Sequence, residues 1–165
     1  MLYRIKQFWH ALFPRIRSWE QAYLKQHIPP EALPLFFRQS AADQRHALDV
    51  ALQLKSWNLP LSQVEYRVLQ LAALFHDCGK TQKGIKLWQR VAIVVLERAP
   101  QRIRLSAEQS RSFSLALQIA AKHADWGSEA AGKAGLPPVV CALIRDHHRP
   151  NSNLGRLLQK ADNRN

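Results

Sequence analysis

Apolar residues recur at intervals of three and four positions along most of the chain, which is the period of a helix with one buried face. The first such run spans residues 1–26, where Pro14 is expected to kink or interrupt the helix. Its apolar positions are Ile5, Phe8, Trp9, Leu12, Ile16, Trp19 and Tyr23. Alternating β-branched runs bounded by tight-turn dipeptides are absent. The pattern therefore predicts an all-α fold that opens with a basic amphipathic helix or helix pair.

Capping residues and prolines divide the rest of the chain into further predicted helices. Ser40 is the predicted N-cap of a helix that runs to about Ser56. Ser62 and Glu65 form a capping-box pattern that begins a helix reaching His76. The remaining predicted helices cover about 31–38, 85–98, 106–123, 127–134, 137–148 and 154 to the end, with a loop between Gly79 and Gly84 and Pro137 in a first turn.

Length and charge narrow the class of protein. The chain has 165 residues, 47% of them apolar, so we expect one compact globular domain. Its formal net charge of +12 favours anionic partners such as nucleotides, phosphate esters, nucleic acid or acidic lipids. Seven basic residues against one glutamate lie between Lys80 and Arg104. Nucleic-acid binding is therefore one hypothesis, ranked behind the two functions given below. Because no nucleic-acid-binding motif accompanies these residues, no stable nucleic-acid partner is predicted.

The cysteines and apolar runs indicate a cytoplasmic protein. Cys78 and Cys141 are expected to be reduced thiols, since nothing suggests a disulfide framework. The most apolar run, 91–96, is far too short to span a membrane, and the N-terminus lacks a signal-peptide cleavage site. The N-terminal amphipathic segment is expected to pack on the domain, with peripheral membrane contact as the alternative.

Histidines and aspartates form an ordered set along the chain. His76 and Asp77 are adjacent, Asp146 precedes the pair His147 and His148, and Asp162 lies near the C-terminus. Imidazole and carboxylate together suit a divalent metal such as Mn, Fe, Ni, Zn or Mg, and the lack of a cysteine cluster argues against structural zinc. Each residue alone has an ordinary role in capping or packing, but the ordered set favours a metal site.

This order resembles the HD-domain metal-dependent phosphohydrolase superfamily. The segments that carry the resemblance are QRHALDVALQL, LAALFHDCGK, KHADWGSEAAGKAGLPPVVCALIRDHH and LLQKADN, which together cover about residues 35–162. The chain is most similar to the HDIG and HD-GYP type branch, as a stand-alone bacterial-type protein. The resemblance implies a compact helical-bundle HD domain over residues 31–165, preceded by the amphipathic segment 1–30.

The resemblance also implies roles for particular residues. One metal would be held by His46, His76, Asp77 and Asp162. In the dinuclear branch Asp77 would bridge to a second metal held by His123 and His147, with His148 as the other candidate ligand or a substrate-facing group. Lys80 matches the lysine that is expected to meet substrate phosphate, so Asp77 and Lys80 are the predicted catalytic residues. Further basic residues expected near the site are Arg45, Lys83, Arg145 and Arg149.

The implied activity is hydrolysis of a phosphate ester, of a nucleotide or cyclic dinucleotide, by a metal-activated hydroxide. The chain departs from HD-GYP proteins because His147 and His148 are followed by Arg149, Pro150 and Asn151 instead of a glutamate and a Gly-Tyr-Pro segment. Cys78 stands where the HDIG form has isoleucine. The alternative function is a non-catalytic metal- or nucleotide-binding module that senses a ligand or a partner. The number of metals and the oligomeric state do not follow from the sequence.

Overall fold

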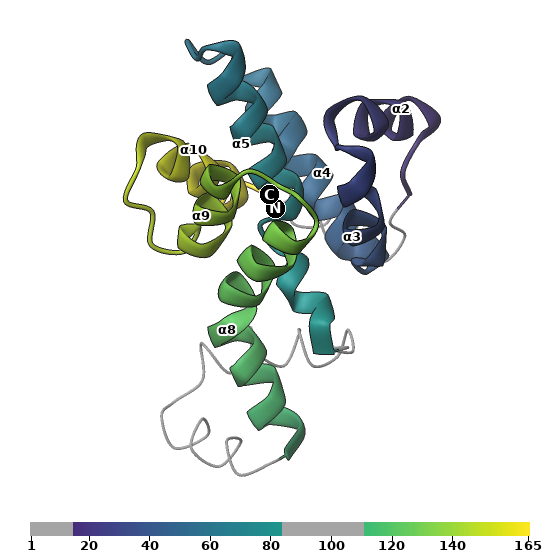
Figure 1. The fold of residues 1–165 in the computed structure, drawn as a ribbon, viewed down its shortest axis with the longest axis vertical. Helices are drawn as coiled ribbons and strands as arrows, with labels where there is room; N and C mark the ends of the chain where they lie inside the picture. The colour runs from purple at the N-terminus through teal and green to yellow at the C-terminus, as the bar shows by residue number, and fades with distance from the viewer. Residues whose placement is uncertain (1–14, 84–110) are drawn as a thin grey trace, which may run out of the picture.

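The computed structural model describes residues 15–83 and 111–165, with side chains at 15–80 and 122–165. Within these ranges the chain forms helices and no strand (Figure 1), which confirms the predicted all-α class. The elements are α2 (Ser18–His27), η1 (Pro30–Ala32), α3 (Leu33–Arg38), α4 (Ala41–Ser56), α5 (Gln63–Phe75), η2 (Cys78–Lys83), α8 (Arg111–Lys133), α9 (Pro138–Asp146) and α10 (Asn153–Asp162). The predicted helix over 85–98 and most of the first one, residues 1–14, lie outside the described residues.

Local capping chemistry sets where α4 and α5 begin. The Ser40 hydroxyl accepts a hydrogen bond from the Asp43 backbone N–H at 3.2 Å. At α5 the Ser62 hydroxyl accepts from the Glu65 N–H at 3.3 Å, while the Glu65 carboxylate accepts from the Ser62 N–H at 2.9 Å. These bonds satisfy N–H groups that have no partner inside the helix. Both predicted helix starts are confirmed.

Three predicted boundaries are wrong. Residues 106–123 and 127–134 were expected to form two helices, but α8 continues through Gly127 to Lys133. Glycine weakens a helix by about 1 kcal/mol relative to alanine, yet here tertiary contacts keep the helix intact. The expected loop after Gly79 is instead the 3₁₀ helix η2. Finally, Pro137 is the N-cap of α9 and not part of its first turn, and α9 ends at Asp146.

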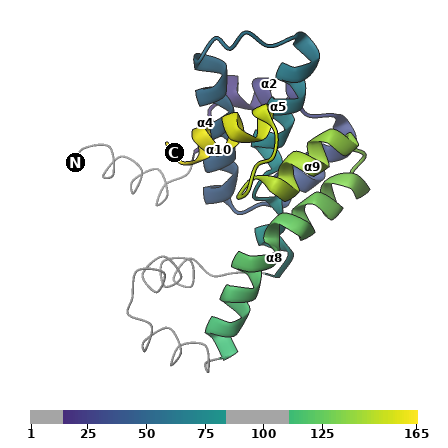
Figure 2. The same cartoon turned by 90° about the vertical axis from the view of Figure 1, so that its left-hand side faces the viewer.

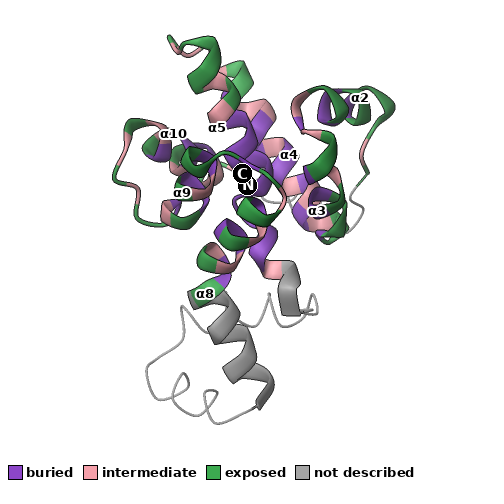
Figure 3. Ribbon diagram, in the orientation of Figure 1, coloured by how far each residue is buried: buried purple, intermediate pink, exposed green. Residues whose placement is uncertain are grey.

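Helix α5 lies at the centre of the described fold. It contacts α2, α4, α9 and α10, and all seven of its last residues, 69–75, are buried. Six of these seven residues are apolar, and a helical stretch that is apolar on every side is stable when it is enclosed in this way. Figures 2 and 3 show α10 and α9 lying beside α5, and Figure 3 shows the buried residues concentrated where α4 and α5 pass each other. The residues that follow Phe75 therefore emerge in the interior of the protein.

Helix α2 packs on the same centre through polar contacts. The buried Glu20 carboxylate binds the buried Arg45 guanidinium of α4 at 2.8 Å. The Tyr23 hydroxyl donates to the side-chain oxygen of Gln70 on α5 at 2.5 Å, and Gln70 in turn donates to the Ala51 carbonyl at 3.1 Å. In the described part of the chain, α2 is thus fixed to both α4 and α5. No described helix has the length and hydropathy that crossing a membrane requires.

Candidate metal centre

His76 and Asp77 directly follow the central helix α5 and are both buried. His76 is the C-cap residue of α5, and its Nδ1 is hydrogen-bonded to the Ala73 carbonyl oxygen at 2.9 Å. A carbonyl oxygen only accepts, so Nδ1 carries the proton and the ring is held with Nε2 turned toward the neighbouring acidic groups. This arrangement is the one that orients a histidine for metal binding through Nε2.

We call His46, His76, Asp77 and Asp162 the first cluster, because their side chains meet although three helices supply them. Nε2 of His46, on α4, lies 2.9 Å from Oδ1 of Asp162, on α10, and 4.0 Å from Oδ2 of Asp77. Nε2 of His76 lies 3.6 Å from that same Asp77 oxygen and 3.5 Å from Asp162 Oδ1. The structure therefore brings together all four residues that the resemblance assigned to one metal.

We call His123, His147 and His148, together with Asp77, the second cluster. Nε2 of His123, on α8, lies 3.6 Å from Asp77 Oδ1, and Nε2 of His147 lies 3.9 Å from the same oxygen. His147 repeats the arrangement of His76, since its Nδ1 is hydrogen-bonded to the Ile144 carbonyl at 2.6 Å. Asp77 thus offers Oδ2 to the first cluster and Oδ1 to the second. A carboxylate in this position can bridge two cations.

Two buried nitrogens support the view that these clusters fit a metal. Nε2 of His76 and Nε2 of His147 are inaccessible to solvent and have no hydrogen-bond partner. An unpaired buried polar atom is costly, and the few found in native proteins call for an explanation such as an ion. Histidine nitrogens and carboxylate oxygens are also the donors that Mn, Fe, Ni and Zn accept. The residues present fit one or two divalent cations.

His147 and His148 differ in their surroundings. His147 is fully enclosed, whereas His148 is exposed and its Nε2 lies 2.9 Å from Nε2 of His123. Ligand atoms of His123, His147 and His148 lie close enough to hold one ion. The buried, unpaired nitrogen favours His147 as the ligand, and the exposure of His148 favours a position at the rim.

Electrostatics tie these groups to one another. Burial alone would raise the pKa of Asp77, but its interactions with neighbouring side chains, that of the Lys80 ammonium first, hold this pKa well below its usual range. Burial lowers the pKa of His76, and the carboxylates of Asp77 and Asp162 outweigh it, so the net shift is upward. A proton and a divalent cation would therefore compete for the same His76 nitrogen. In His147, burial and the charge of His76 lower the pKa to about 3, which keeps that ring neutral.

The basic residues expected near substrate differ in their exposure and in their contacts. The Lys80 ammonium contacts the Asp77 carboxylate, and its side chain is 31% exposed, so it lies at the mouth of the clusters. Arg149 is exposed, beside His148. Arg145 bonds to the Ser128 hydroxyl at 3.1 Å, and the Lys83 side chain lies outside the described ones.

Arg45, which was expected near substrate, is instead enclosed by acidic partners. Its guanidinium binds Glu20 at 2.8 Å and Asp49 at 2.6 Å, and it donates to the Arg15 carbonyl at 3.3 Å. Although Arg45 precedes His46 in sequence, neighbouring helix residues point about 100° apart. Its contacts make it part of the junction between α2 and α4.

Two residues near the clusters were given no role from the sequence. Asp43 is buried one helical turn before His46. Burial lowers the pKa of Lys80, but the surrounding carboxylates raise it by more, that of Asp77 first, and the Asp43 carboxylate adds to that increase. Gly127 packs against the backbone of Gly79. The available signal was spacing, since Asp43 lies three residues before His46 and Gly127 lies four after His123.

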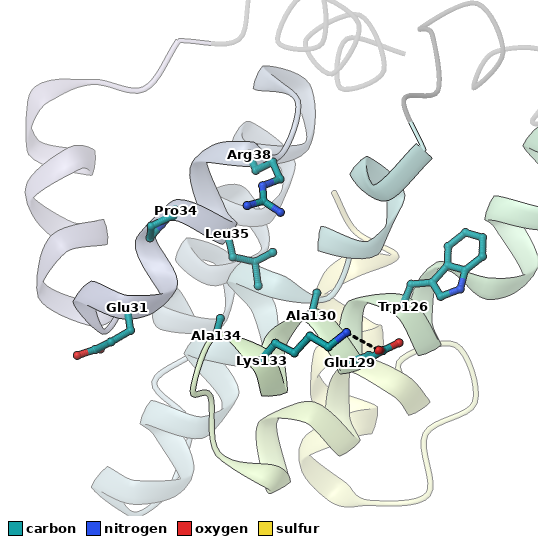
Figure 4. Close-up of a pocket in the computed structure, with 9 residues that line it drawn as sticks. All are labelled: Glu31, Pro34, Leu35, Arg38, Trp126, Glu129, Ala130, Lys133 and Ala134. Carbon is teal, nitrogen blue, oxygen red and sulfur yellow. Dashed lines mark hydrogen bonds and ion pairs between the residues drawn. The ribbon is translucent and has the colours of Figure 1, made fainter.

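A cavity of about 490 Å³ lies apart from both clusters, between α3 and the C-terminal half of α8 (Figure 4). Neither cluster contributes a residue to it. Its lining residues are Glu31, Pro34, Leu35, Arg38, Trp126, Glu129, Ala130, Lys133 and Ala134. The Lys133 ammonium in its wall is already paired with Glu129 at 2.6 Å. Among the described residues, the histidine and aspartate groups that could hold a metal gather around Asp77 and not in this cavity.

Comparison with protein families accounts for the ordered histidines and aspartates. The family model described as HD domain matches residues 44–164, which is most of the chain and includes every residue of both clusters. The chain belongs to the HD domain family. HD domain proteins are grouped in a metal-dependent phosphohydrolase superfamily, and this chain has the histidine and aspartate clusters to hold metal. Searches among curated proteins and among solved structures found no match.

Proposed function

We propose that this HD domain protein is a dinuclear phosphohydrolase of the HDIG and HD-GYP type that cleaves a phosphate ester of a nucleotide or cyclic dinucleotide. The observation that carries the proposal is the division of Asp77 between two clusters. Its Oδ2 faces His46 and His76, while its Oδ1 faces His123 and His147. The proposed ligands of the first ion are His46, His76, Asp77 and Asp162, and those of the second are Asp77, His123 and His147.

When bound, two divalent cations neutralise phosphoryl charge and lower the pKa of an attacking water. The chain itself supplies the orientation of the ligands. The carbonyls of Ala73 and Ile144 fix the rings of His76 and His147, so that each presents Nε2 to Asp77. Because the last seven residues of α5 are buried, Asp77 follows a rigid support, which is the condition for precise ligand placement.

Substrate phosphate would be met by residues at the mouth of the site. Lys80 is partly exposed and points its ammonium at Asp77, so a phosphoryl oxygen near Asp77 would lie within its reach. Exposed His148 lies beside His123, and the exposed Arg149 follows it in sequence, so both are candidates to contact the remainder of the substrate. A net charge of +12 favours a polyanionic substrate such as a nucleotide.

The proposal is tested by hydrolysis assays on the purified full chain loaded with Mn²⁺. Bis(p-nitrophenyl) phosphate and p-nitrophenyl phosphate separate diesterase from monoesterase activity, and nucleotides and cyclic dinucleotides follow. We expect Mn²⁺-dependent hydrolysis that Asp77→Asn abolishes. His27→Gln is the matched control, since His27 is hydrogen-bonded to the Tyr23 carbonyl away from both clusters and should retain full activity.

Two results would contradict the proposal. Metal binding without hydrolysis of any phosphate ester would favour the non-catalytic sensing module. A chain that binds no divalent metal would show that the clusters serve only the structure. Equal loss of activity in Asp77→Asn and His27→Gln would mean that the assay reports stability instead of chemistry.

A further inference from the structure

Two glycines bring the backbone of η2 into direct contact with the backbone of α8. A Cβ atom added to Gly79 would overlap the His123 carbonyl oxygen and lie 2.6 Å from the Gly127 amide nitrogen. These two atoms belong to one turn of α8, so Gly79 lies directly over that turn. No side chain fits between η2 and α8 at this point.

Gly127 meets the same contact from the side of α8. A Cβ atom added there would lie 3.2 Å from the Gly79 nitrogen, 3.3 Å from Ile144 Cγ2 and 3.4 Å from Cys78 Sγ. The Cys78 thiol also donates a weak hydrogen bond to the Gly127 carbonyl at 3.5 Å. Gly127 is therefore enclosed by η2 and α9 together, and a Cβ atom there would fit only if these neighbours moved by a few tenths of an ångström.

This contact determines how close His123 comes to Asp77. His123 lies one helical turn before Gly127 on α8, and Asp77 lies two residues before Gly79. The 3.6 Å between His123 Nε2 and Asp77 Oδ1 thus depends on the approach of the two backbones. The first cluster contains no residue of α8, since its members come from α4, from α10 and from the end of α5. A displacement of α8 would alter the second cluster alone.

We propose that Gly127 is a positioning residue for the second metal, because its lack of a side chain lets α8 approach η2 closely enough for His123 to share Asp77 with the first cluster. The inference rests on the proposed dinuclear site. It also explains why a helix-weakening residue lies within α8, since alanine would strengthen the helix but widen the contact.

The test is Gly127→Ala in the full chain, with Mn²⁺ binding followed by calorimetric titration. We expect the first ion to bind as in wild type and the second to bind at least about tenfold more weakly, the scale on which groups outside the ligand set alter metal affinity. Gly132→Ala is the matched control. It lies on the same helix, and its added Cβ would meet only Cys141 Sγ at an ordinary 3.8 Å. It should bind both ions as wild type does.

The outcomes separate the two proposals. If wild type binds two ions and Gly127→Ala binds both equally well, the positioning role is wrong while the dinuclear site stands. If wild type binds fewer than two, the dinuclear site fails and the positioning role fails with it. Weakening of both ions, the same loss in Gly132→Ala, or failure of Gly127→Ala to unfold cooperatively in urea would show a general structural role and overturn the inference.

Discussion

The Glu20 carboxylate binds the Arg45 guanidinium at 2.8 Å, with both side chains less than a tenth exposed. This ion pair fixes α2 to α4 in the interior of the protein. The backbone N–H of Arg17 also donates to the Glu20 carboxylate, at 2.6 Å, so the same group begins α2 and attaches it. Arg45 keeps Asp49 as a second acidic partner, at 2.6 Å, so removing the Glu20 charge leaves the buried guanidinium only partly compensated.

We therefore expect Glu20→Gln to lower the free energy of unfolding by about 2 kcal/mol, which is less than the cost of leaving a buried charge with no partner. Urea denaturation followed by circular dichroism measures the change. Glu129→Gln removes an ion pair of similar length, 2.6 Å to Lys133, but both of those side chains are exposed. That control should change stability very little. Equal effects of the two substitutions would show that burial of the Glu20 pair is energetically unimportant.

Gly79→Ala should be among the most damaging single substitutions in the chain. Its Cβ would overlap backbone atoms of α8, which no side-chain rotation can relieve. We expect a loss of about 4 kcal/mol or failure to fold. Gly135, at the end of α8, has φ +79° and nothing near its missing Cβ. Gly135→Ala tests conformational strain alone and should cost about 1–2 kcal/mol. A smaller loss at Gly79 than at Gly135 would contradict the backbone contact.

His147→Gln and His148→Gln should separate the two neighbouring histidines. The buried Nε2 of His147 has no partner, whereas His148 is exposed. We expect His147→Gln to weaken the second Mn²⁺ by more than about tenfold and His148→Gln to leave both ions bound while changing turnover. Calorimetry together with the phosphate-ester assay measures both effects. The reverse pattern would make His148 the ligand.

Thiol labelling tests the burial of Cys78. Burial raises its pKa to about 12, so at mildly alkaline pH the group stays a protonated thiol and is a poor nucleophile. Cys141 is less enclosed, although burial also raises its pKa. We expect the native protein to show slow reaction of Cys141 alone with a disulfide reagent, and both cysteines to react in guanidinium. Rapid native labelling of Cys141→Ser would contradict the contact between η2 and α8.

Sequence patterns predicted best what short stretches of chain decide. Ser40 and Ser62 begin α4 and α5 because a cap needs only residues within one turn. Gly127 was misread as a helix break because its compensation comes from Gly79, which is distant in sequence. Arg45 was expected near substrate, and local patterns could not reveal its ion pair with Glu20 because that partner lies 25 positions away. The resemblance already implied that Asp77 is shared between two metals, and coordinates were needed to show that Oδ2 faces the first cluster and Oδ1 the second.

His46 and Asp162 meet across 116 positions of chain. Between them the backbone passes through α5, α8 and α9. Helix α8 contains His123, while His76 and His147 directly follow the last residues of α5 and α9. Closing a loop of this length has an entropic cost that only the rest of the folded domain can offset. No shorter fragment contains the whole set, so the site exists only when the complete topology does. Loss of α10 docking alone would remove Asp162, and with it the carboxylate that lies 2.9 Å from His46 and 3.5 Å from His76.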